Sequence, residues 1–242
     1  MHLPEPVRAT LRDCDDETVR AVYEDLLAPV FRPEELLSPE ELRTAYGTGG
    51  RSPSTVLLAG GRPLAVMLGE WFQDRRVLLL SYLSVSDAAR GSGLGTTLLT
   101  EDLPTWWGDA PAPLVLAEVD DPAVWPSEAM GGDPQARLRF YGRHGASLAP
   151  LPYVQPSLQG SSARVDGMLL LRLGEAEGEV AGLADFLREY FVACEGPGAL
   201  DDPEVLGLLE LAARHDEQGE WWDVARWPEV RGTGAAAEEV TP

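Results

Sequence analysis

Residues 77–96 read VLLLSYLSVSDAARGSGLGT, and this stretch decides the fold. Val77 to Val85 is a nearly continuous apolar run, as expected for a central strand that is covered on both faces. The glycine-rich loop Arg90-Gly91-Ser92-Gly93-Leu94-Gly95 follows, and a helical pattern begins at Thr96. Glycines allow close approach of a ligand to the backbone, and free N–H groups at the start of a helix suit a pyrophosphate. The stretch therefore predicts a strand–loop–helix unit that binds a phosphorylated ligand.

Three classes of phosphorylated ligand compete for this loop. In the dinucleotide fingerprint G-x-G-x-x-G the third glycine would stand one residue later, and no clean strand–acid pair follows about 20 residues on. A phosphate-binding loop of the Walker type needs a lysine, and all 19 basic residues of the chain are arginines. Coenzyme A is the third class, and it requires neither feature.

The elements around this unit predict a mixed α/β fold. Its central sheet is expected to be mostly antiparallel and flanked by helices, with a helical C-terminal extension. We expect one domain over residues 1–175, the extension packed on it over 176–230, and a flexible tail over 231–242. The expected helices are 15–27, one from 39, 96–107, 135–144, 179–194 and 203–220, and the expected strands are 55–59, 64–72, 77–85, 114–119, 146–154 and 166–173.

Composition excludes several classes of function. Asp and Glu number 40 against 19 arginines, a net charge of −21, which disfavours nucleic acid and membrane surfaces as partners and favours cationic ones. The absence of lysine excludes a Schiff-base site. Two distant cysteines and three scattered histidines predict neither a disulfide framework nor a metal site. With no signal peptide or membrane span in the sequence, the cytoplasm is the expected compartment.

Two parts of the sequence resemble the GNAT superfamily of N-acetyltransferases. Leu83-Ser84-Val85, then Arg90-x-x-Gly93-x-Gly95 and a helix, is similar to the family's motif A. A later strand, LVLAEV over 114–119, precedes a helix with Phe140-Tyr141-x-x-x-Gly145, which is similar to a second family element. The resemblance covers residues 45–173 and includes the order of the elements.

The resemblance implies acetyl-CoA as co-substrate, with no metal. The central strand would bulge and splay from the next strand, and an acceptor amine would attack the acetyl carbonyl directly, with the Val85 N–H as oxyanion donor. Backbone groups of the strand would bind pantetheine, and the N–H groups of the loop would bind pyrophosphate. The residues expected to bind the coenzyme are Leu83, Ser84, Val85, Arg90, Gly91, Ser92, Gly93, Leu94, Gly95 and Thr96.

Two proton transfers need further residues. Tyr141 matches the position of the family's general acid, although a packed aromatic residue is the alternative. Glu118, a carboxylate on an apolar strand, is the candidate base or amine-binding group, and its alternative is a structural pair with an arginine at position 137 or 139. Glu70 and Asp120 are weaker candidates for substrate binding, and a water chain could replace any of these bases.

These residues together predict an acetyl-CoA-dependent N-acetyltransferase that acts on a primary amine of a small, cationic acceptor. A non-catalytic acyl-CoA-binding or regulatory module remains an alternative, as does an acyltransferase with another acyl donor or a hydroxyl acceptor. An NAD-dependent oxidoreductase is the remote alternative. The acid-rich C-terminal stretch leaves a homodimer open.

Overall fold

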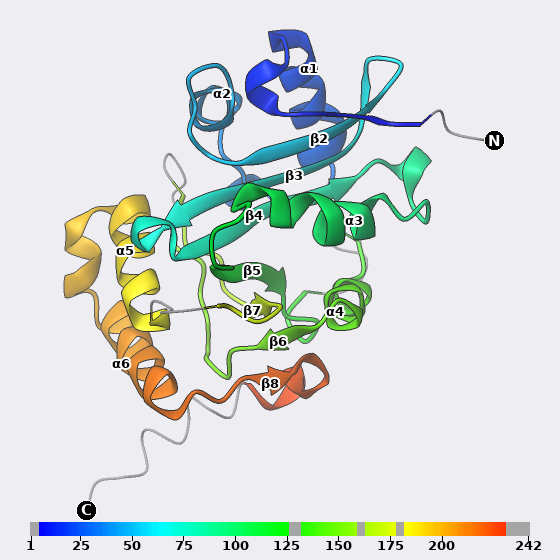
Figure 1. Cartoon of the computed structure of the whole chain (residues 1–242). Helices are drawn as coiled ribbons and strands as arrows, with labels where there is room; N and C mark the ends of the chain where they lie inside the picture. The colour runs from blue at the N-terminus through cyan, green and yellow to red at the C-terminus, as the bar shows by residue number, and fades with distance from the viewer. Residues whose placement is uncertain (1–4, 126–131, 159–162, 178–181, 231–242) are drawn as a thin grey trace, which may run out of the picture.

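A computed structural model describes residues 5–125, 132–158, 163–177 and 182–230. Its centre is an eight-stranded sheet in the order β1-β2-β3-β4-β5-β7-β6-β8 (Figure 1). The described neighbours run antiparallel except β4 and β5, which are parallel, so the expected mixed and mostly antiparallel sheet is confirmed. The strands are β1 (Val7–Ala9), β2 (Ser54–Ala59), β3 (Arg62–Phe72), β4 (Val77–Val85), β5 (Leu114–Asp120), β6 (Ala146–Leu148), β7 (Met168–Leu173) and β8 (Trp222–Asp223).

The N-terminal helices cover one face of β2, β3 and β4. They are α1 (Asp16–Ala21), which continues as a wider-turned helix over Val22–Leu27, and α2 (Pro39–Tyr46). Ser38 caps α2 as the sequence predicts: its hydroxyl accepts from the Glu41 N–H, and the Glu41 carboxylate accepts from the Ser38 N–H. Apolar side chains of both helices form one buried cluster with β3 and β4.

The opposite face of the sheet is covered by two helical stretches that follow β4 and β5. The first begins as α3 (Leu94–Thr97) and continues through a wide-turned segment (Leu98–Asp102) to a 3-10 turn (Leu103–Trp106). The second is α4 (Pro134–Arg143). Their leucines pack on alternate residues of β4 and β5, which explains why these positions of both strands are apolar.

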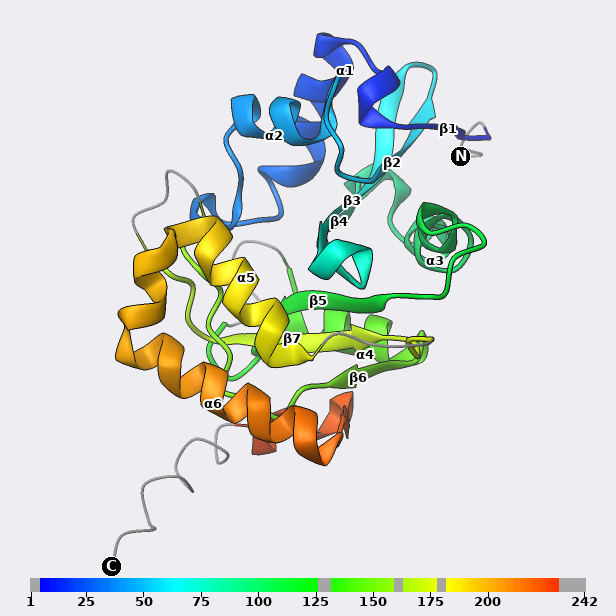
Figure 2. The same ribbon diagram turned by 60° about the vertical axis from the view of Figure 1, so that its left-hand side comes forward.

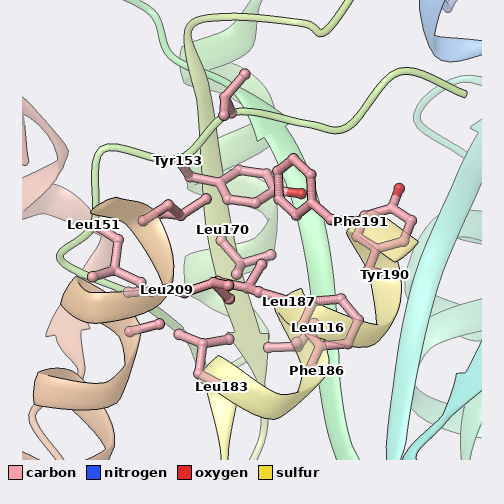
Figure 3. Close-up of a cluster of buried hydrophobic side chains, with 14 of the residues drawn as sticks. Leu116, Leu151, Tyr153, Leu170, Leu183, Phe186, Leu187, Tyr190, Phe191 and Leu209 are labelled. Carbon is pink, nitrogen blue, oxygen red and sulfur yellow. The ribbon is translucent and has the colours of Figure 1, made fainter. Parts of the chain in front are cut away.

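The C-terminal helices share a core with the sheet. α5 (Leu183–Glu195) and α6 (Pro203–Gln218) are joined by a 3-10 segment (Pro197–Asp201) and lie over β5 and β7 (Figure 2). Figure 3 shows the α5 side chains meeting those of Leu116 and Leu170 from the sheet. The described helices α5 and α6 therefore pack on the sheet, while the tail expected over 231–242 lies outside the described residues.

The structure differs from the sequence expectation at both ends of the sheet. The strand expected over 146–154 stops at Leu148, because Pro150 and Pro152 lack the N–H groups that a ladder needs. The strands β1 and β8 are short additions at the two edges of the sheet that the sequence analysis missed. A 3-10 segment (Val224–Glu229) follows β8. Among the described residues, no helix is both long and apolar enough to cross a membrane.

Candidate functional site

The central strands β4 and β5 separate along their length. Their described ladder joins Val77–Leu80 to Leu114–Ala117 and extends no further. On the other edge of β4 the register shifts, with Leu68 opposite Tyr82 and Gly69 opposite Leu80, which leaves Ser81 as the extra residue of a bulge. A bulge bends its strand, so the bulge at Ser81 turns the rest of β4 away from β5. The expected bulge and splay are both present.

The splay exposes backbone groups of β4 on the side of β5. The Ser86 N–H donates to the Leu64 carbonyl at 2.8 Å, and the register pairs Ala65 with Val85. Hydrogen-bonded pairs alternate along an antiparallel ladder, so the N–H and C=O groups of Leu83 and Val85 point away from β3. These groups therefore face the opening between β4 and β5, as expected for pantetheine binding. The Ser84 hydroxyl instead donates to the Leu26 carbonyl at 2.6 Å.

A cavity of about 530 Å³ lies where β4 runs into the glycine-rich loop. Among the described residues that line it are three arginines, Arg90, Arg137 and Arg143, and a single acidic residue, Asp133. We call this the donor cavity. Nine of the ten residues expected to bind the coenzyme line it, the exception being Ser92. Its remaining lining residues are Val30, Leu83, Ser84, Val85, Ala89, Gly91, Gly93, Leu94, Gly95, Thr96, Gly132, Ala136, Phe140 and Tyr141.

The loop that borders the donor cavity has a conformation that favours glycine at two positions. Gly91 and Gly93 have φ values of 75° and 88°, and a Cβ at either would meet nothing within 4 Å. Ser92 bonds within the loop, donating to the Ala89 carbonyl, and Arg90 pairs with Asp87 at 3.0 Å on the surface. A backbone cradle rimmed by arginines fits a pyrophosphate, because both supply positive charge.

Thr96 has a partner that the sequence analysis did not anticipate. Its Oγ1 lies 3.1 Å from Nε2 of His144, and Nδ1 of the same ring lies 2.8 Å from the Phe140 carbonyl. A carbonyl only accepts hydrogen bonds, so Nδ1 carries the proton and, in the neutral ring, Nε2 accepts from the Thr96 hydroxyl. The pair ties the start of α3 to the end of α4 across the donor cavity.

Tyr141 lies on α4 and lines the donor cavity, with 7% of its surface exposed. Burial raises its pKa to about 12, and the charge of Arg137 opposes that rise. The phenol therefore stays protonated at neutral pH and retains a proton that it can donate. Its ring also packs in the cluster beneath α4, so the packing and the acidic roles are compatible.

A second cavity, of about 370 Å³, lies on the other side of the bulge. Four glutamates, Glu35, Glu70, Glu118 and Glu189, line it, and no Arg or His is among the described lining residues. We call this the acceptor cavity. Ser81 and Tyr82 line it, whereas the next three residues of β4 line the donor cavity. Its other lining residues are Leu37, Ser52, Trp71, Phe72, Gln155, Leu158, Tyr190, Ala193 and Cys194.

Glu118 lies on β5 and is bonded by uncharged groups. Tyr153 and Gln155 donate to its two oxygens, the latter at 2.9 Å, and the Tyr190 hydroxyl lies 3.4 Å from Oε2. Burial raises its pKa to about 7, although the bonds from Tyr153 and Gln155 oppose the rise. Uncharged side chains therefore hold this carboxyl group, in place of the arginine that the sequence analysis considered. A group with this pKa exchanges protons readily near neutral pH.

The two weaker sequence candidates lie in different places. Glu70, on β3, lines the acceptor cavity, and burial raises its pKa. Asp120, at the end of β5, is 3% exposed and does not line either cavity; its oxygens lie 2.8 Å from Arg32 and 2.9 Å from Arg137. Two guanidinium partners already compensate its charge, so we do not assign it to substrate binding.

The buried ion pairs at Asp120 extend toward the acceptor cavity. Arg32, in the segment after the first helix, also pairs with Glu35 at 2.6 Å and lies over the Trp125 ring at 3.7 Å. Tyr82 fixes the same segment, because its hydroxyl donates to the Glu35 carbonyl at 2.8 Å. Neither Glu35 nor Arg32 was singled out in the sequence, where no spacing connects them to β5.

The C-terminal helix α5 forms a wall of the acceptor cavity. Glu189, Tyr190, Ala193 and Cys194 line it. The Glu189 carboxylate accepts from both the backbone and the side chain of Gln73, at 3.0 and 2.5 Å, which fixes α5 to the turn between β3 and β4. The sequence analysis gave no role in the site to this helix.

Comparison with known proteins places the fold. No family model matches the chain, and no curated protein matches it in sequence. Among solved structures it is similar to a protein from Bacteroides thetaiotaomicron described as a GNAT-family acetyltransferase, with 23% identity and a TM-score of 0.53 over 71% of this chain and 88% of that one. The ribosomal-protein-S18-alanine N-acetyltransferase from Escherichia coli matches with 16% identity and a TM-score of 0.48, over 72% of this chain and 96% of that one.

Proposed function

We propose that this chain, whose fold is that of the GNAT superfamily, transfers an acetyl group from acetyl-CoA to a primary amine of a small cationic acceptor. The observation that carries the proposal is the opposite sign of the ionisable side chains that line the two cavities on either side of the bulge in β4. Three arginines line the donor cavity, and four glutamates line the acceptor cavity. A net charge of −21 would not by itself produce this separation. It matches an anionic donor on one side of β4 and a cationic acceptor on the other.

The donor cavity fits the coenzyme in charge and in backbone geometry. The loop from Arg90 to Gly95 offers N–H groups to the pyrophosphate, and Arg90, Arg137 and Arg143 offer guanidinium groups. The inward-facing groups of Leu83 and Val85 offer a short ladder to the pantetheine amides. When bound, the coenzyme supplies the acyl group as an activated thioester.

The residues around the bulge divide the proton transfers between them. Glu118 accepts a proton from the acceptor ammonium and passes it to solvent, because only the neutral amine has a free electron pair. The Val85 N–H donates to the acyl oxygen as negative charge develops there. Tyr141 donates its proton to the departing sulfur. One C–N bond forms and one C–S bond breaks. The nitrogen loses a second proton as the amide forms, and this proton balances the one that Tyr141 gives to the sulfur. One proton is therefore released overall.

The test is release of free thiol from acetyl-CoA by the purified chain with a panel of primary amines, matched alcohols and acidic amines. The proposal predicts turnover with cationic amines and none with the alcohols. Calorimetry with coenzyme A is run in parallel. Binding of coenzyme A without turnover on any amine would refute an enzymatic role and support a binding module, and turnover only with another acyl-CoA or with alcohols would refute the stated donor or acceptor.

A further inference from the structure

Glu70 and Glu118 lie on the same face of the sheet, on the two strands that flank β4. Glu70 is two residues before Phe72, and Glu118 is two residues after Leu116. Phe72 and Leu116 belong to one buried cluster, and residues two apart on a strand share a face. Two strand spacings, about 10 Å, separate the strands β3 and β5. The register places Glu70 level with Leu116 through Leu79, so Glu118 lies two residues further along β5. The acceptor cavity therefore has a carboxyl group toward each side of its floor.

The two carboxyl groups differ in what surrounds them. Glu118 is bonded by Tyr153 and Gln155. Among the described residues Glu70 has no cationic partner, and the uncharged Tyr46 hydroxyl interacts with it and favours its ionised form. A carboxyl group enclosed in this way is costly to ionise without a partner. Its missing partner is a hydrogen-bond donor with positive charge.

Polar atoms of the acceptor cavity also lack partners. Within the described part of the chain, Ser81 Oγ at the bulge and Oε1 of Gln155, whose Nε2 donates to Glu118, have no hydrogen-bond partner. Both residues line the cavity, and Gln155 is 6% exposed. Buried polar atoms are nearly always paired in folded proteins, by protein, water or ligand. Each of these oxygens can accept a hydrogen bond, and an ammonium group has three N–H groups to donate.

We infer that the acceptor carries two cationic groups: an amine that reacts beside Glu118 and a second ammonium that Glu70 binds at the opposite side of the cavity. The inference rests on the proposed function and specifies its substrate class as a diamine. Glu70 is then the residue that determines specificity, because a monoamine of equal length leaves its carboxyl group unpaired. The aromatic residues Phe72 and Tyr190, which belong to the cluster on this face of the sheet, line the same cavity and suit the carbon chain between the two nitrogens.

The experiment compares linear diamines, from diaminopropane to diaminohexane, with alkyl monoamines of the same chain length. Thiol release gives kcat/KM, and calorimetry with coenzyme A present gives affinity without chemistry. The inference predicts at least a tenfold preference for one diamine over its matched monoamine, the change expected for a charged hydrogen bond. Glu70→Gln should remove that preference. Glu34→Gln, which removes an exposed carboxylate beside the cavity-lining Glu35, should keep it.

The outcomes separate this inference from the proposed function. Equal turnover of diamines and monoamines refutes the second ammonium site and leaves the acetyltransferase proposal standing. Absence of turnover with every amine refutes the acetyltransferase proposal. In that case, tighter calorimetric binding of a diamine than of its matched monoamine, lost in Glu70→Gln, still supports the second ammonium site. A diamine preference that Glu70→Gln retains, in a variant whose thermal unfolding matches the parent, refutes the role of Glu70.

Discussion

Replacing Glu118 by glutamine should change how stability depends on pH. Burial raises the pKa of this carboxyl from 4.5 to about 7. Between those two values the folded chain keeps a proton that the unfolded chain has released, so the free energy of unfolding falls as pH rises through this window. Each pKa unit is worth about 1.4 kcal/mol, so the full loss is about 3 kcal/mol. Glutamine has the same shape and cannot ionise, so the variant lacks this loss.

The measurement is urea unfolding of the parent and of Glu118→Gln at about pH 5 and about pH 8. Other acids contribute equally to both proteins, so the difference between them isolates this carboxyl. From about pH 5 to about pH 8, we expect the free energy of unfolding of the variant to rise by about 2 to 3 kcal/mol relative to that of the parent. Glu34→Gln, an exposed change of the same charge, should show no such gain. Parallel pH dependences of Glu118→Gln and the parent would refute both the raised pKa and the role of Glu118 as base.

Three further changes test other parts of the site. Tyr141→Phe should lower kcat about 100-fold in the thiol assay, with KM for acetyl-CoA within about threefold, and an unchanged kcat excludes the tyrosine as acid. Gly93→Ala places a side chain on a residue with φ 88°, and it should lower the free energy of unfolding by about 1–2 kcal/mol and the calorimetric affinity for coenzyme A about tenfold. Gly49→Ala, at φ 86° in a distant loop, should lower the free energy of unfolding and leave the affinity unchanged. Asp120→Asn should lower the free energy of unfolding in urea by about 3 kcal/mol, since it leaves two partly buried arginines undercompensated, and a loss below about 1 kcal/mol contradicts this account.

The donor side of the site could be predicted from the sequence because its parts are local. Strand, glycine loop and helix start lie within residues 77–96, and each has a short-range signal such as an apolar run or closely spaced glycines. The bulge has no such signal and was expected only from the resemblance to the GNAT superfamily. The positive φ values of Gly91 and Gly93 agree with that prediction. Tyr141 could be predicted because a second motif, close to a helix end, carries it.

The acceptor side could not be predicted because its contacts span long separations. Tyr153, Gln155 and Tyr190 reach Glu118 from 35, 37 and 72 residues away, and no spacing in a single sequence encodes such contacts. Asp120 was a reasonable candidate beside Glu118, but its pairing with Arg32 depends on where the N-terminal segment folds back. Short edge strands such as β8 have too few residues to give a periodic signal.

The wall that α5 contributes to the acceptor cavity has a consequence for how this protein can be altered. The helix brings four cavity residues on one continuous segment, while the described residues that line the donor cavity come mainly from β4, the glycine loop, the start of α3 and α4. Under the proposed function, exchange of the exposed rim of this one helix should redirect the choice of amine while the thioester chemistry is kept. Both an evolving lineage and a protein engineer could vary the two halves of the reaction separately.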